Sequence, residues 1–302
     1  MAQDQSFEVI IIGGSYAGLS AAMALGRSLR KTLVIDGGKP CNQQTPYSHN
    51  FLTQDGSTPK QINTLARQQV AQYESIQFVD DVAVKAEKIH DGFGITSLSG
   101  KTFTGKKLVL ASGIKDKMPN ISGFSECWGI SVIHCPYCHG YEYRGHNTGI
   151  FANGERAFHL AALVNNLTSE LTVLTNGKAD FTSEQSDDLK RHNIAVIGTE
   201  IAAIVHRDGY LEKVNLMDGN SISLTALYAA IPFFQHSDIA ASLGCELTTP
   251  GHIKVDLFQK TTIPDVFACG DNSSMIRSVA NAIATGNIVG AMINRELTME
   301  QF

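Results

Sequence analysis

The sequence predicts an α/β protein with two Rossmann-like, three-layer nucleotide-binding domains, the second inserted into the first. Three observations lead to this prediction. A strand, a glycine turn, a helix and an acidic strand end follow one another near the start, a related unit recurs in mid-chain, and a strand ending in Gly-Asp precedes a long helix near the end. With 302 residues, 27 glycines and 43% hydrophobic residues, the chain is long enough for two cores connected by many loops.

The first unit starts with Phe7–Ile12, an apolar, β-branched run of strand length. The letters G-G-S-Y-A-G occupy positions 13–18, and a helix over residues 19–29 and a second strand, Leu33–Asp36, follow. In this arrangement a glycine turn lets backbone amides approach a pyrophosphate at the amino terminus of a helix. The acid at the end of the second strand, Asp36, is then expected to accept hydrogen bonds from an adenosine ribose.

The second unit repeats this pattern. Its predicted parts, in order, are a strand over 149–151, the turn A-N-G-E-R-A over 152–157, a helix over 158–167 and a strand over 171–174. Both units continue into short strands that end alike, at 108–113 and 226–232. The repeat predicts a domain of about residues 114–224 inserted into a domain formed by residues 1–113 and 225–302.

The composition limits the possible partners and compartments. The formal net charge of −5 lacks the basic excess that binding to a phosphate backbone needs, so no nucleic-acid partner is expected. The chain starts with a polar segment, Met1–Ser6, and has no apolar stretch long enough to cross a bilayer, so no membrane association is expected. Six cysteines, four of them isolated, do not form a secreted disulfide framework, and we expect a cytoplasmic protein.

The remaining two cysteines, Cys135 and Cys138, form a Cys-x-x-Cys pair, which can cycle between dithiol and disulfide. The same letters with His139 also describe a c-type haem attachment site, but no haem-sized fold or export signal accompanies them. A zinc site would need two more ligands, and the only histidines at suitable spacing are His134 and His139. We therefore expect a redox disulfide and no metal.

Near the carboxyl end, T-x-x-P-x-V-F-A-x-G-D spans residues 261–271 and precedes a helix predicted over 278–296. Together with the amino-terminal turn, this pattern resembles the FAD-binding domain of pyridine-nucleotide disulfide oxidoreductases. The order of the FAD turn, the strand end at 108–113, Cys-x-x-Cys, the second turn and Gly-Asp resembles the low-molecular-weight thioredoxin reductase family over nearly the whole chain. The resemblance implies a homodimer.

The resemblance also implies roles for the residues of the redox motif. Cys138 would face the flavin and form the charge-transfer thiolate, while Cys135 would attack or release the substrate sulfur. His139 stands where thioredoxin reductases usually carry an aspartate acid, and an imidazole there can take a proton from an incoming thiol or return one to a leaving thiolate. The run C-P-Y-C-H-G-Y-E over 135–142 is similar to the subgroup containing the gliotoxin and holomycin dithiol oxidases.

The expected FAD-binding residues follow from the same resemblance. Asn50 matches an asparagine near the isoalloxazine, and Asp271 is expected to bind the ribityl or phosphate region. Ser278 replaces a family glutamine at the pyrimidine edge of the flavin, so the backbone amide and the helix amino terminus are expected to supply those contacts. Ser15, at the second glycine of the turn, is small enough to permit close approach. The expected FAD-binding residues are Gly13, Gly14, Ser15, Gly18, Asp36, Asn42, Asn50, Ala111, Gly113, Gly270, Asp271, Ser278 and Val279.

The second nucleotide site departs from the family. Reductases that use NADPH follow the second strand with His-Arg-Arg, because guanidinium groups bind the 2′-phosphate, whereas this chain has T-N-G-K over 175–178. Ala152 also replaces the first glycine of the second turn. The inserted domain is expected either to bind NADPH or NADH weakly or to have lost the nucleotide and to carry only the disulfide.

The sequence leaves three functional hypotheses open. In the reductive version, a pyridine nucleotide reduces FAD, which reduces the disulfide and then a thioredoxin-like protein or a small-molecule disulfide. In the oxidative version, a substrate dithiol reduces the disulfide, and electrons pass through FAD to oxygen or another acceptor. In the third hypothesis, the protein is a flavin-binding redox sensor whose disulfide state switches a protein contact.

Overall fold

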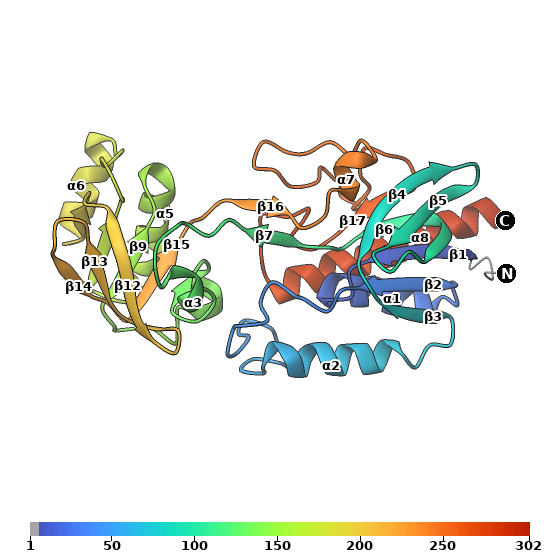
Figure 1. Cartoon of the computed structure of the whole chain (residues 1–302), viewed down its shortest axis with the longest axis horizontal. Coiled ribbons are helices and arrows are strands. Elements are labelled where there is room, and N and C mark those ends of the chain that lie inside the picture. The colour runs from blue at the N-terminus through green and yellow to red at the C-terminus, as the bar shows by residue number, and fades with distance from the viewer. Residues whose placement is uncertain (1–5) are drawn as a thin grey trace. The chain divides into compact units, whose positions relative to one another are not determined.

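The computed structural model describes residues 6–302, which divide into two compact units (Figure 1). The first segment of the larger unit ends at Gln43, and the unit also contains Phe51–Lys115 and Phe233–Phe302. The smaller unit contains Gln44–Asn50 and Asp116–Pro232. The start of the chain, residues 1–5, lies outside the described residues.

A seven-stranded sheet forms the centre of the larger unit, in the order β3-β2-β1-β6-β5-β4, with β17 also paired to β6. The strands are β1 (Ser6–Ile12), β2 (Thr32–Asp36), β3 (Ile76–Asp80), β4 (Ala83–Ile89), β5 (Gly92–Ser97), β6 (Thr102–Leu110) and β17 (Val266–Ala268). The pairs β1–β2, β1–β6, β2–β3 and β6–β17 are parallel. Helices cover a parallel sheet on both faces, which explains why β1 is an almost continuous apolar run.

Two helices from opposite ends of the chain, α1 (Tyr16–Arg27) and α8 (Val279–Gln301), lie side by side against this sheet (Figure 1). Glycine makes their close approach possible, because a Cβ atom on Gly286 would lie 2.1 Å from the carbonyl oxygen of Ala17. The other helices of the unit are α2 (Pro59–Val70), which starts with a capping box formed by Thr58 and Gln61, and the short α7 (Ile239–Ser242). The two chain ends therefore build one core.

A five-stranded parallel sheet in the order β11-β10-β9-β15-β8 forms the centre of the smaller unit. Its strands are β8 (Val132–Ile133), β9 (Thr148–Phe151), β10 (Leu171–Leu174), β11 (Ala195–Ile197) and β15 (Ala226–Ala229). The unit also has helices α3 (Phe124–Cys127), α4 (Pro136–His139), α5 (Gly154–Val164) and α6 (Ser183–Arg191), and an antiparallel sheet of β12 (Ile201–Arg207), β13 (Tyr210–Leu216) and β14 (Ser221–Ser223). A further two-stranded sheet pairs β7 (Ile114–Asp116) with β16 (Phe233–Gln235).

The predicted elements are confirmed, with differences at their ends. The helix predicted over 19–29 runs from Tyr16 to Arg27, because Leu29 adopts a left-handed backbone with φ of 58°. The helix predicted over 158–167 is α5, which starts four residues earlier, at Gly154, and ends at Val164. The strand expected over 226–232 is β15, which lies between β9 and β8, so the smaller unit extends to Pro232 and not to residue 224.

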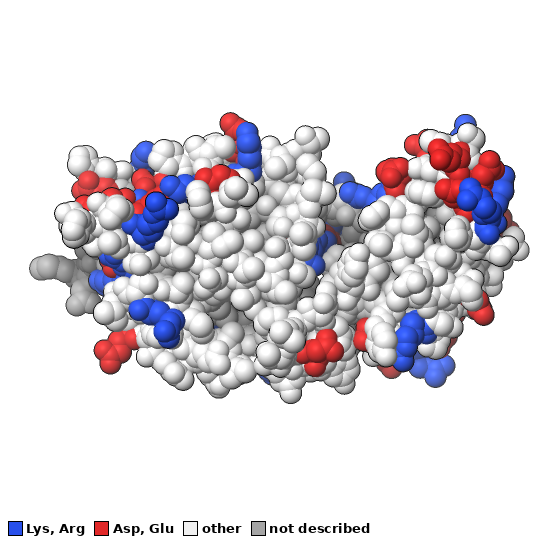
Figure 2. Space-filling model, turned by 180° about the vertical axis from the view of Figure 1, so that it is seen from behind, with Lys and Arg blue, Asp and Glu red and all other residues white. Residues whose placement is uncertain are grey.

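Charged side chains of both signs are interspersed on the face shown in Figure 2, where Lys and Arg lie beside Asp and Glu. None of the helices within residues 6–302 combines the length and the apolar character that a bilayer crossing requires.

Candidate active site

The glycine turn after β1 brings three backbone segments of the larger unit together. Gly13 has φ of +106°, and a Cβ atom built there would lie 2.3 Å from the carbonyl oxygen of Ala111, just beyond β6. A Cβ atom on Gly18 would lie 1.9 Å from the carbonyl oxygen of Gly13. Neither position can accept a side chain without displacing backbone, so the strand ends of β1 and β6 stay close to the start of α1.

The amino terminus of α1 is open. Ser15 is its N-cap residue but makes no capping hydrogen bond with its side chain, and the first turn carries no acidic residue. Uncapped N–H groups and the helix dipole favour an anion at such an end. Asp36 lies next to this turn, because its Cβ is 2.7 Å from the position that a Cβ on Gly14 would occupy. The uncapped start of α1 and the carboxylate of Asp36 are therefore adjacent, an arrangement that suits the phosphate and the ribose of a dinucleotide.

The Gly-Asp end of β17 completes this region. Gly270 has φ of +84°, its N–H donates to Thr285 Oγ1 at 3.1 Å, and a Cβ built on it would lie 3.0 Å from Ala17 Cβ in α1. Asp271 Oδ2 is 3.8 Å from Arg277 Nε. The sequence motif at 261–271 thus lies in the same unit as the amino-terminal turn, although about 250 residues separate the two in the chain.

The side-chain amide oxygens of Asn42 and Asn272 are among the buried oxygen atoms of this unit that have no hydrogen-bond partner within the described residues. Asn42 donates through Nδ2 to the Tyr16 hydroxyl at 3.2 Å, but its Oδ1 has none. Asn272 is completely buried and donates to the carbonyl oxygen of Leu110 at 2.8 Å, and its Oδ1 also has none. Buried acceptors normally find a donor, and the hydroxyl groups and ring N–H of FAD are donors. The residues present therefore fit FAD. Asn272 was missed from the sequence, although it directly follows the Gly-Asp pair.

The remaining predicted FAD-binding residues lie in three places. Gly113, with φ of +67°, follows β6 and Ala111. Ser278 is the N-cap of α8, where its Oγ accepts from the N–H of Asn281 at 3.1 Å, and Val279 is the first residue of that helix. Asn50, with φ of +58°, belongs to the segment Gln44–Asn50 of the smaller unit, so it is not grouped with the others.

The redox motif lies in the smaller unit, on a single helical turn. Cys135 is the N-cap of α4, and its carbonyl oxygen accepts from the N–H groups of Cys138 and His139, both at 3.3 Å. Pro136 occupies the first helical position, where its missing N–H costs nothing. Both cysteines are half-buried. The turn fixes the two sulfur-bearing side chains on adjacent positions of one short rigid segment.

Burial and the neighbouring charge of His49 lower the pKa of His139 to about 4. The His139 imidazole is therefore neutral near pH 7 and can accept a proton. His49 itself lies 3.6 Å, measured from Nε2, from Glu142 Oε1. His139 on the redox turn therefore has His49 as a neighbour, and His49 in turn contacts the carboxylate of Glu142. Sequence reasoning gave His49 no partner, because Glu142 is distant in the chain and the pairing depends on the fold.

The corresponding helix of the smaller unit, α5, has a closed amino terminus. The side chain of Asn153 accepts from the N–H groups of Gly154 and Asp180, both at 2.9 Å, and donates to the carbonyl oxygen of Lys178 at 2.8 Å. Glu155 adds a carboxylate to the first turn. The N–H group and the positive helix end that a pyrophosphate would use are thus occupied by a side chain and opposed by acidic groups. These residues do not fit a nicotinamide dinucleotide.

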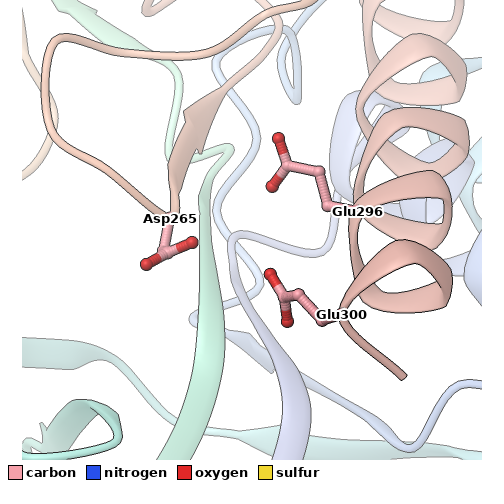
Figure 3. A group of neighbouring side chains, drawn as sticks. All are labelled: Asp265, Glu296 and Glu300. Carbon is pink, nitrogen blue, oxygen red and sulfur yellow. The ribbon is translucent and has the colours of Figure 1, made fainter. Parts of the chain in front are cut away.

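In the described part of the chain, a group of three acidic side chains has the spacing of a metal site. Asp265, Glu296 and Glu300 point toward one another in the larger unit (Figure 3). Lys107 Nζ already lies among them, at 2.5 Å, 3.1 Å and 2.5 Å from their oxygens. The ammonium group pairs with all three carboxylates, and Lys260 also pairs with Glu296, so this cluster is an ion-pair network.

Comparison with known proteins agrees with both sets of motifs. The family model described as pyridine nucleotide-disulphide oxidoreductase matches residues 7–286. The chain belongs to this family. It is 32% identical to thioredoxin reductase tcpT from Claviceps purpurea (strain 20.1), over 98% of this chain and 96% of the relative. The structures of an oxidoreductase from Agrobacterium tumefaciens (36% identity, TM-score 0.91) and of a putative thioredoxin reductase TrxB from Bacillus anthracis (29% identity, TM-score 0.93) each cover 98% of this chain, and this chain covers 99% and 100% of them.

The family assignment confirms the main predictions from the sequence. The protein has the two-domain, Rossmann-like α/β fold of thioredoxin reductases and is an enzyme, a disulfide oxidoreductase of the thioredoxin reductase type. The family is one of FAD-binding enzymes. The pyridine nucleotide in the family name contrasts with the closed amino terminus of α5 in this chain.

Proposed function

We propose that this oxidoreductase binds FAD and oxidises dithiols, with Cys135 and Cys138 as its redox pair and a small-molecule dithiol or a thioredoxin-like dithiol as substrate. The difference between the two helix ends carries the proposal. The start of α1 is uncapped, whereas the side chain of Asn153 caps the start of α5, which supports a dinucleotide at α1 and disfavours a nicotinamide dinucleotide at α5 as the source of electrons. Electrons then enter from the dithiol. A homodimer is proposed from the family resemblance, and a cytoplasmic location from the cysteine composition.

The residues of the larger unit would hold FAD. The turn at Gly13 and Gly14 and the start of α1 would bind the pyrophosphate, Asp36 the ribose, and Asn42 and Asn272 would accept hydrogen bonds from cofactor donors. The chemistry that bound FAD supplies is the acceptance of two electrons from the reduced cysteine pair, which then pass to oxygen or another acceptor.

The thiol exchange can be written with the chain's own residues. A substrate thiolate attacks Cys135 Sγ, the Cys135–Cys138 bond breaks, and Cys138 leaves as a thiolate. The second substrate thiolate attacks the substrate sulfur bound to Cys135, which forms the substrate disulfide and releases Cys135. Each substrate thiol loses one proton. His139, neutral near pH 7, is placed on the same helical turn to accept one, and the His49–Glu142 pair lies beside it.

Anaerobic reduction of the purified holoprotein tests the direction of electron flow. We expect a dithiol to bleach the flavin absorbance rapidly, and NADPH and NADH to leave it unchanged on the same time scale, because the end of α5 is closed. Cys135→Ser serves as a control and should not be bleached by the dithiol. Rapid bleaching of the parent protein by NADPH or NADH would overturn the oxidative assignment and establish a reductase.

Replacement of His139 by Gln is expected to lower the dithiol turnover about a hundredfold, since a positioned base contributes roughly 10²–10⁴. The pH dependence of turnover should also reflect the lowered pKa of His139. Because burial and His49 lower the pKa of His139 to about 4, the parent keeps its neutral base on acidification through 6.5 and loses it only near that lower value.

The measured quantity is the kcat/KM of the parent divided by that of His139→Gln at each pH. Ionisation of the substrate thiol affects both enzymes equally, so it cancels in this ratio. The ratio should stay constant from about pH 8 to 5 and fall below that. His159→Gln, on the exposed side of α5, is the matched control and should behave as the parent. A ratio that falls near pH 6.5, or a variant within threefold of the parent, would contradict the role of His139 as a base.

A further inference from the structure

Tyr228 is the largest fully buried side chain of the protein and sits at the centre of the smaller unit. It is 1% exposed and packs in an apolar cluster with residues such as Ile133, Ile150 and Val173. A buried tyrosine hydroxyl normally has a hydrogen-bond partner, since leaving it without one costs free energy. None of the described residues forms a hydrogen bond with this hydroxyl, and its oxygen is not completely enclosed. Apolar packing alone would be served equally well by phenylalanine.

The strand register places Tyr228 beside the entrance to the redox turn. Tyr228 in β15 is paired with Ile133, the last residue of β8, and with Ile150 of β9. The chain leaves β8 after Ile133 and reaches Cys135 two residues later. Since parallel strands end at one edge of the sheet, the tyrosine and the redox cysteine belong to the same edge.

Gly140 shows where the hydroxyl lies. This residue ends α4, and its N–H donates to the carbonyl oxygen of Pro136 at 2.8 Å. A Cβ atom built on Gly140 would lie 3.1 Å from the Tyr228 hydroxyl and 2.2 Å from the Pro136 oxygen. The phenol oxygen therefore reaches the backbone of the turn that carries both cysteines, and the absence of a side chain at position 140 is what allows it to come this close.

We infer that Tyr228 is a positioning residue of the redox turn, and that its buried hydroxyl acts as an O–H donor that stabilises the Cys135 thiolate. The inference rests on the proposed redox role of Cys135 and deepens it. When the substrate disulfide forms, Cys135 is released as a thiolate at the edge of an apolar core, where a fixed O–H dipole is effective because little water screens it.

The ionisation of the phenol itself is consistent with this role. Burial, the negative charges of Cys135 and Glu142, and the neighbouring Tyr143 raise the pKa of Tyr228 above the ordinary range for tyrosine. The phenol therefore keeps its proton wherever the thiol titrates, and it can donate throughout the working pH range. The groups that face it are Cys135, Glu142 and Tyr143, and none of them is a cation that could take over the stabilisation of the thiolate.

The test is the pH dependence of Cys135 alkylation by iodoacetamide in the reduced holoprotein. Following the Cys135 peptide by mass spectrometry excludes the exposed Cys41 from the signal. We expect Tyr228→Phe to raise the midpoint by about one pH unit, which slows alkylation roughly tenfold at a fixed pH below the midpoint. Tyr143→Phe is the matched control, because its hydroxyl donates to the carbonyl oxygen of Ile130 at 2.8 Å, and its midpoint should equal that of the parent.

An unchanged midpoint in Tyr228→Phe, or an equal shift in Tyr143→Phe, would overturn the inference. If the phenylalanine variant does not fold, 3-fluorotyrosine placed at position 228 keeps the shape and strengthens the donor, and it should lower the midpoint; no change there would also overturn it. Alkylation requires neither flavin turnover nor an electron acceptor. A protein that is bleached by NADPH but shows the predicted shift would therefore refute the oxidative direction and retain the role of Tyr228.

Discussion

Cys138→Ser is expected to lower dithiol oxidation by at least about a thousandfold while leaving bound FAD in place. A serine hydroxyl cannot close a disulfide with Cys135, so the variant has no S–S bond for a substrate thiolate to attack and the exchange cannot start. The flavin should remain because the proposed FAD-binding turn, Asp36 and the Gly-Asp pair all lie in the larger unit, whereas Cys138 lies in α4 of the smaller one. Turnover and the flavin-to-protein absorbance ratio are measured on the same preparation.

Cys245→Ala provides the matched control. This thiol is buried in the larger unit, 3.7 Å from Thr261 Oγ1, and burial raises its pKa above the ordinary range for a thiol, so it is not expected to take part in exchange. The control should turn over as the parent does. If Cys138→Ser kept more than a tenth of the parental turnover, the redox chemistry would not depend on the Cys135–Cys138 pair. Absence of turnover in the parent as well, with every dithiol tried, would favour a redox sensor over an enzyme.

Most of the fold could be predicted from local sequence signals. β1 and β2 are continuous apolar runs because they are buried on both faces of a parallel sheet, and Gly13 and Gly18 occupy positions where any Cβ would meet backbone. The Gly-Asp motif at the end of β17 could likewise be assigned before its neighbours were known. These features can be recognised from short stretches of sequence, without knowledge of how the rest of the chain folds.

The limits of the smaller unit could not be predicted in the same way. The run that forms β15 is as apolar as the end of β6, so its composition does not show which sheet it joins. Its membership follows from pairing with β9 and β8 across about 75 and 95 residues of chain. The segment Gln44–Asn50 shows the same limitation, since it lies within the first domain in sequence but groups with the second unit.

The candidate site was predicted in its residue types but not in its electrostatics. The sequence identified Cys135, Cys138 and His139, but an acid or a base role for His139 depends on its burial and on His49, which only the fold brings near. The altered second turn was also recognised. That Asn153 caps the helix with its own side chain, and so closes it, depends on the position of Asp180 in space.

Lys107→Met is expected to destabilise the larger unit by roughly 3 kcal/mol, the lower end of the range for breaking a buried ion pair. The Lys107 side chain is 4% exposed, and its ammonium contacts Asp265, Glu296 and Glu300. Burial opposes the charge, but the hydrogen bonds to the three carboxylates outweigh it and raise the pKa of Lys107 above its ordinary range. The variant would leave the carboxylates close together with only Lys260 to balance them.

Thermal unfolding of the holoprotein measures this effect, and Lys260→Met is the matched control. Lys260 also pairs with Glu296, but its side chain is 44% exposed, so its loss should cost less than about 1 kcal/mol. Equal melting temperatures for the two lysine variants would mean that Lys107 contributes by packing of its alkyl chain and not by its charge. Since Lys107 joins β6 to α8 and to the loop before β17, an electrostatic role would mean that this one ammonium group helps to hold together the two ends of the chain that form the FAD-binding unit.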